Sequence, residues 1–139
     1  MAARILKLPV DRMHGCEARP VSTSNQLASQ FERLRFWRGA SGRCYPYAAY
    51  RLIECPPVTA ATYVMVQRPE AGPAKVLRVG HVRHAAATLN LAELRHIGAS
   101  VGADEIHLHF VAGEVADVLA VELDMKAARQ DGMLAASAG

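Results

Sequence analysis

Four short segments are predicted to be β-strands, and in the last of them, from Asp104 to Phe110, polar and apolar residues alternate with the period of two that is typical of a half-buried strand. Aromatic residues at Tyr45, Tyr47 and Tyr50 favour a strand in the first segment, whereas Pro46 indicates a sheet edge or a strand start there. A Pro- and Gly-containing loop over 68–73 separates the second and third segments, which predicts an antiparallel hairpin. We therefore expect strands over 44–53, 61–67, 74–80 and 105–111.

Apolar residues at helical spacing indicate three further elements. Leu27, Phe31 and Leu34 form one such stripe near the N-terminus. Asn90 followed by Glu93 is typical of a capped helix start. We expect three helices, over 25–37, 91–101 and 113–129.

The order of these elements is typical of an α+β domain with a small, mostly antiparallel sheet flanked by helices. The chain has 139 residues, which is the length of one domain. We expect an N-terminal arm over 1–22 and a single domain over 23–130. Residues 131–139 are rich in Ala, Gly and Ser, and we expect them to form a disordered tail.

The chain carries no apolar run long enough for a transmembrane helix, and its first residues lack the features of a signal peptide. We therefore expect a cytoplasmic protein without a membrane partner. The cysteines Cys16, Cys44 and Cys55 follow no metal-ligand spacing. Their odd number fits a reducing compartment, in which they would be unpaired thiols.

The net charge of +3 is unevenly distributed. Residues 1–55 carry nine Lys and Arg against four Asp and Glu (+5), whereas residues 113–139 carry two against five (−3). A basic front half can bind DNA or RNA, although a solvated surface would have the same composition. Arg43 and Arg51 flank the three tyrosines, and such basic and aromatic residues together can stack bases. The candidate phosphate contacts are Arg33, Arg35, Arg38, Arg43 and Arg78.

Four sequence motifs follow one another in a recognisable order. They are Thr62-Tyr63-Val64-Met65-Val66, Val76-Leu77-Arg78-Val79-Gly80, Gly102-Ala103-Asp104-Glu105-Ile106-His107-Leu108-His109 and Val121-Glu122-Leu123-Asp124. In this order the chain resembles a bacterial branch of the GIY-YIG nuclease domain, over about 80 residues from Tyr45 to Met125. The resemblance implies a GIY-YIG-like α+β core with an added N-terminal helix.

The resemblance also implies a catalytic set, part of which is changed in this chain. GIY-YIG nucleases hydrolyse a phosphodiester with one divalent metal on a helical glutamate, two strand tyrosines and a helical arginine. Tyr63 matches the first tyrosine, and Glu122 matches the glutamate that would hold Mg²⁺ or Mn²⁺. Arg78 replaces the second tyrosine, and Arg95 is the available helical arginine. Because arginine stays protonated and is a poor general base, we expect a catalytically degenerate module.

The leading hypothesis is a module that binds nucleic acid, or a subunit of a nucleic-acid-associated complex. One alternative is a metal-dependent endonuclease that cuts DNA, for which Tyr63, Arg78, Arg95 and Glu122 would have to converge on one pocket. Another is a structural subunit that binds a protein partner, for example through Trp37. A further option is a transition-metal site built from histidines, for which the candidates are His81, His84, His107 and His109.

Overall fold

The computed structural model describes residues 33–110, 115–130, 132 and 136–138. Within these residues the chain forms strands, a short 3-10 helix (η1) and two α-helices. Their order is β1 (Leu34–Arg38), β2 (Cys44–Arg51), η1 (Leu52–Glu54), β3 (Ala61–Gln67), β4 (Lys75–Val82), α3 (Ala87–Val101), β5 (Glu105–Phe110), α4 (Val115–Gln130) and β6 (Ala136–Ala138).

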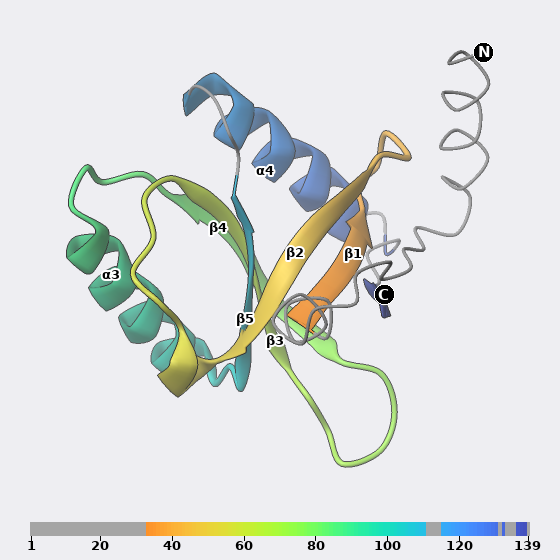
Figure 1. The fold of residues 1–139 in the computed structure, drawn as a ribbon. Coiled ribbons are helices and arrows are strands. Elements are labelled where there is room, and N and C mark those ends of the chain that lie inside the picture. Colours follow the sequence, from red (N-terminus) through yellow and green to blue (C-terminus); the bar gives the residue numbers. More distant parts are fainter. Residues whose placement is uncertain (1–32, 111–114, 131, 133–135, 139) are drawn as a thin grey trace, which may run out of the picture.

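The described strands form one antiparallel sheet in the spatial order β4-β3-β5-β2-β1-β6 (Figure 1). The predicted hairpin is confirmed, because β3 pairs with β4 from Ala61 opposite Val82 to Gln67 opposite Lys75. Strand β5 enters the sheet after α3 and lies between the β3–β4 and β1–β2 hairpins. The α+β class and the antiparallel sheet with two helices are therefore confirmed.

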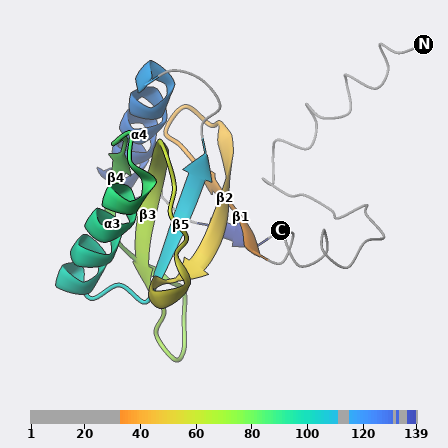
Figure 2. The ribbon, with the colours of Figure 1, turned by 60° about the vertical axis from the view of Figure 1, so that its left-hand side comes forward.

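The helices α3 and α4 cover opposite faces of this sheet (Figures 1 and 2). Strand β3 shows the alternation that makes this possible, since Tyr63 and Met65 pack with Leu94 of α3. The neighbouring residues Val64 and Val66 instead pack in the cluster that contains Val121 and Met125 of α4. We call these two sides the α3 face and the α4 face. Side chains of β3 are thus buried on both faces, as in the centre of a three-layer domain.

The predicted N-terminal helix is wrong over 34–37, because these residues belong to β1. Trp37 lies opposite Tyr45 of β2, and the two strands are joined by a turn in which Gly42 adopts a φ of 92°. Pairing between large aromatic side chains across two strands outweighs helical spacing of apolar residues here. Residues 25–32 of that expected helix and the arm over 1–22 lie outside the described residues.

Helix α3 begins at Ala87, four residues before the predicted start, and Asn90 is not its cap. The Asn90 side chain is fully buried and donates to the carbonyl oxygens of Val58, Thr59 and His84 at 2.7–3.0 Å. Asn90 therefore fixes the loops on either side of the β3–β4 hairpin instead of ending a helix.

The end of the chain adds a strand that hydropathy did not predict. Residues Ala136–Ala138, expected in a disordered tail, form β6 opposite Arg35, Phe36 and Trp37 of β1. Alanine is depleted in strands, and the segment contains no β-branched or aromatic residue, so its composition carries no strand signal. Between β3 and β4, a loop extends away from the sheet (Figures 1 and 2). In the described part of the chain, neither helix is long and apolar enough to cross a membrane.

Candidate functional site

Tyr63 and Arg78, two of the four residues predicted to form a catalytic set, lie next to each other. Arg78 Nε donates to the Tyr63 hydroxyl at 3.1 Å. Tyr63 is 2% exposed, and its ring packs over Gly80 so closely that an added Cβ would lie 2.6 Å from Tyr63 Cζ. Only glycine fits at position 80 without displacing the Tyr63 side chain, so packing alone accounts for this glycine.

Glu122 lies on the other face of the sheet. Its carboxylate contacts His81 Nδ1 at 2.9 Å and Lys126 Nζ at 3.0 Å. His81 and Thr62 are opposite each other in the hairpin, and the Thr62 hydroxyl donates to a carbonyl of α4. Glu122 is thus on the α4 face, and its two oxygens already have partners.

Arg95 is separate from both of these groups. On α3 its guanidinium donates to the carbonyl oxygens of Ile53 and Cys55 at 3.3 and 3.5 Å, beside η1. The structure therefore brings Tyr63 and Arg78 together, but it brings neither Arg95 nor Glu122 to them. The catalytic and metal-binding roles of these four residues stay predictions.

The arginines predicted to contact phosphate fall into three places. Arg38 and Arg43 lie at the turn between β1 and β2, where Arg38 donates to the carbonyl of Gly42 at 3.2 Å. Arg78 is exposed on β4. Arg33 and Arg35 lie together at the other end of β1, beside a hollow in the surface.

This hollow, which we call the arginine pocket, has a volume of about 280 Å³. It lies where β1, β2 and β5 meet η1, and three of its seven lining residues are arginines. The lining residues are Arg33, Arg35, Ala49, Tyr50, Arg51, Glu54 and Glu105. The pocket thus combines an aromatic ring, several guanidinium groups and two carboxylates.

Contacts within the wall hold the pocket residues in place. The Arg33 guanidinium lies 4.8 Å from the centre of the Tyr50 ring, and it donates to the Ala49 carbonyl at 3.2 Å. Its contact with Glu54 is long, at 4.0 Å, with both side chains nearly half exposed. Arg35 donates to the carbonyl of Leu34 at 2.8 Å. Backbone carbonyls thus help to orient both Arg33 and Arg35, and the Tyr50 ring contributes to the orientation of Arg33.

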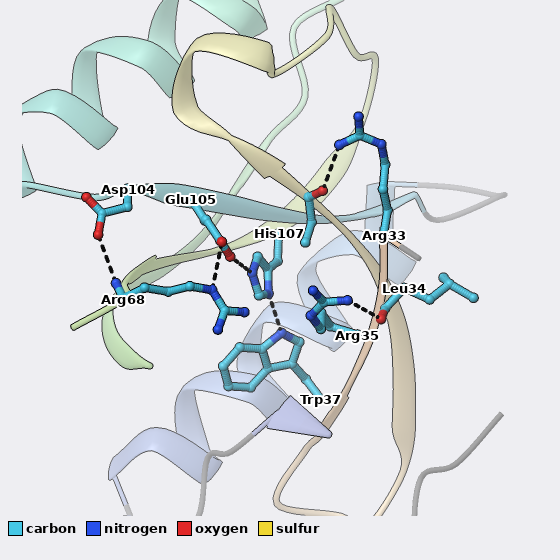
Figure 3. Close-up of polar contacts among 9 residues, drawn as sticks. Arg33, Leu34, Arg35, Trp37, Arg68, Asp104, Glu105 and His107 are labelled. Atoms are coloured by element: carbon cyan, nitrogen blue, oxygen red, sulfur yellow. Dashed lines mark hydrogen bonds and ion pairs between the residues drawn. The ribbon is translucent and has the colours of Figure 1, made fainter. Parts of the chain in front are cut away.

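A chain of hydrogen bonds connects this pocket to the core (Figure 3). Trp37 Nε1 donates to His107 Nδ1 at 3.0 Å, and His107 Nε2 lies 3.0 Å from Glu105 Oε1. Arg68 Nε donates to the other Glu105 oxygen at 2.7 Å. Because the indole can only donate, His107 must carry its proton on Nε2 and donate it to Glu105.

The charges in this chain follow from burial and from the hydrogen bonds. Burial raises the pKa of Glu105, but the hydrogen bonds from His107 and Arg68 outweigh burial and bring that pKa below its usual value. Burial of the fully enclosed His107 lowers its pKa, although the hydrogen bond to Glu105 opposes this. An ionised Glu105 beside a neutral His107 is the resulting state at neutral pH.

Within the described part of the chain, the other histidines and the cysteines do not gather into a second site. His109 donates from Nδ1 to the Pro46 carbonyl at 2.7 Å, and His84 lies 3.0 Å from Glu93. Among the described residues, no three His, Cys, Asp or Glu side chains gather closely enough to hold a metal. Cys55 is a free thiol whose pKa is raised by burial to about 11. Cys44 is disulfide-bonded, so the prediction of an unpaired thiol is wrong there.

Sequence reasoning singled out Arg33, Arg35 and Arg51, but it missed the role of Glu105 and Arg68. Glu105 stands opposite Arg51 in the sheet, and this neighbourhood depends on the pairing of β2 with β5. The alternation of the 105–111 segment placed Glu105 and His107 on one face. Only the order of the strands in the sheet shows that the arginines lie near Glu105 and His107.

Comparison of the chain with family models, with curated proteins and with solved structures gave no match.

Proposed function

We propose that this chain is a nucleic-acid-binding module with a GIY-YIG-like core in which the catalytic set is degenerate. The observation that carries the proposal is the arginine pocket, whose lining contains Arg33, Arg35 and Arg51 together with Tyr50. Guanidinium groups donate two parallel hydrogen bonds to a phosphate, and aromatic rings offer a surface for a base. A nucleotide unit carries both groups, so it complements this combination.

The degenerate character of the core rests on two contacts. Arg78 already binds the Tyr63 hydroxyl, and a permanently protonated guanidinium at this place cannot take a proton from water. The carboxylate of Glu122 is engaged by His81 and Lys126 on the α4 face. The order of hairpin, helix, strand and helix supports the likeness of the core to GIY-YIG domains.

Two contributions to binding follow from this proposal. Arg33 and Arg35 contact phosphates, and these contacts give affinity that falls steeply as salt rises, since binding releases counterions from the nucleic acid. Tyr50 and the Arg33 guanidinium that lies over it provide the stacking surface. Glu54 and Glu105 also line the pocket, and their negative charges repel a continuous run of phosphates. The pocket therefore holds one nucleotide unit and not a long stretch of backbone.

The test is fluorescence anisotropy with labelled single- and double-stranded oligonucleotides at about 50 and 200 mM salt. Phosphate contacts weaken strongly over this range of salt concentration. We expect binding that weakens at higher salt, and a shallower salt dependence in the Arg33→Gln/Arg35→Gln variant, by about one unit of slope for each lost contact. Arg83→Gln is the matched control, because Arg83 is an exposed arginine outside the pocket. The proposal would be contradicted if the protein bound no oligonucleotide. It would also be contradicted if the Arg33→Gln/Arg35→Gln variant and the Arg83→Gln control showed the same affinity and the same salt dependence.

The same samples distinguish the alternatives when Mg²⁺ or Mn²⁺ is added. Cleavage that disappears in Glu122→Ala would establish an endonuclease instead of a degenerate module. Absence of both cleavage and binding would favour the role of a protein-binding subunit.

A further inference from the structure

The wall of the arginine pocket places a hydrogen-bond acceptor beside a donor. Arg51 of β2 and Glu105 of β5 are directly opposite each other in the antiparallel register, and both line the pocket. Side chains of such a pair leave the sheet on the same face, with Cβ atoms about 5 Å apart. A ligand edge in this pocket therefore meets a carboxylate and a guanidinium next to each other.

Glu105 is held so that it can accept further hydrogen bonds. His107 occupies one position on Oε1, and Arg68 occupies one on Oε2. A carboxylate has about four acceptor positions, so each oxygen keeps one for a ligand. The Glu105 side chain is 18% exposed, while His107 behind it is fully buried. The carboxylate is thus fixed from behind and open toward the pocket.

Building on the proposed function, we propose that the arginine pocket recognises the Watson–Crick edge of an unpaired guanine. Guanine presents two adjacent N–H donors, at N1 and N2, and next to them the acceptor O6. The two donors match the carboxylate of Glu105, and O6 matches the guanidinium of Arg51. Each of the other three bases presents an acceptor where guanine has one of these donors, and that acceptor would face the carboxylate.

The pocket also sets the state of the nucleic acid. In a duplex the Watson–Crick edge is paired and hidden, so recognition of this edge requires an unstacked base in a single strand or loop. A volume of about 280 Å³ is small for a ligand site and accommodates one base rather than a duplex.

The experiment uses the full chain and short single-stranded oligothymidines that carry one central guanine, hypoxanthine or adenine. All three probes have the same phosphates, so differences in affinity report on the base alone. We expect guanine to bind roughly tenfold more tightly than adenine. Hypoxanthine, which lacks the N2 amino group, should fall between the two.

The variants Glu105→Gln and Arg51→Gln locate this preference in the pocket. Glu105→Gln puts an amide donor in front of the guanine donors, so the guanine preference should disappear. Glu93→Gln is the matched control, because Glu93 is also a carboxylate that contacts a histidine but lies on α3 outside the pocket. Should Glu105→Gln fail to fold, the exposed Arg51→Gln decides, and it should reduce the preference for guanine over adenine.

The outcomes separate this inference from the function on which it rests. Equal affinity for the three probes would overturn the guanine site and leave a general nucleic-acid-binding module. A guanine preference that survives in both pocket variants would also overturn it. Failure to bind any probe at low salt would overturn the proposed function itself.

Discussion

The buried hydrogen bond between Trp37 and His107 allows the strongest test of the structural reasoning. His107→Leu removes the side chain that accepts the hydrogen bond of the Trp37 indole, and Trp37 is 1% exposed. An unsatisfied buried donor costs about 1–3 kcal/mol. Loss of the donor to Glu105 adds to this, but less, since the carboxylate can take up water from the pocket. We expect His107→Leu to lower the free energy of unfolding by about 2–4 kcal/mol.

The double variant makes this prediction specific. Trp37→Phe alone leaves His107 Nδ1 without its donor, and it also leaves a cavity in the core. When both partners are replaced, no unsatisfied polar atom of the pair remains, so the costs of the two single variants should not add. We expect the double variant to be more stable than the sum of the single effects by about 1–2 kcal/mol.

The assay is urea unfolding followed by far-ultraviolet circular dichroism, because Trp37 is the only tryptophan and its fluorescence is lost in one variant. His96→Leu serves as the control, since His96 is exposed on α3 and surface changes usually stay within about 0.5 kcal/mol. Additivity within about 0.5 kcal/mol would refute the hydrogen bond between the two side chains.

Two further predictions concern packing and pH. Gly80→Ala forces a Cβ against the Tyr63 ring, so the free energy of unfolding should fall by about 1–3 kcal/mol in thermal unfolding. A Tyr63→Phe background should recover part of this loss. An unchanged melting temperature would contradict the close packing. Burial lowers the pKa of His107 and His109 in the folded state below the ordinary value of 6.5, so the unfolded chain takes up protons first as pH falls. Stability should be fully present above about pH 6.5 and should fall toward pH 5, by up to about 1.4 kcal/mol per pH unit for each histidine. Urea titrations at several pH values check this, and a stability that rises on acidification would exclude it.

The sequence predicted the centre of the fold better than its margins. Residues of β5 alternate between polar and apolar, and the loop between β3 and β4 is marked by proline and glycine, so β5 and the hairpin followed from local physics. The segment 34–38 combines large apolar and basic residues that fit either a helix or a strand. Its state is decided by Tyr45 and Tyr47 across the β1–β2 pairing, which is a tertiary effect that no local pattern contains.

The candidate site shows the same division between local and distant information. Arginines and tyrosines could be picked out by their chemistry, but their grouping depends on which strands are neighbours. The arginine pocket needs β5 beside β2, although about 50 residues separate Arg51 from Glu105 in the chain. A residue such as Glu105, isolated in the sequence, therefore gives no sign that it shares a pocket with Arg33 and Arg35.

The position of β5 has a consequence for how ligand binding and folding are coupled. The β1–β2 and β3–β4 hairpins are local, whereas β5 joins them through contacts between residues far apart in the chain. Such long-range contacts are entropically costly and form late in folding. A ligand that bridges Arg51 and Glu105 would bind across the junction between β2 and β5 and would stabilise only chains in which that junction is closed. The same contacts that select the ligand would then slow the opening of the sheet, so occupancy of the pocket would be measurable as protection of β2 and β5 amides from hydrogen exchange.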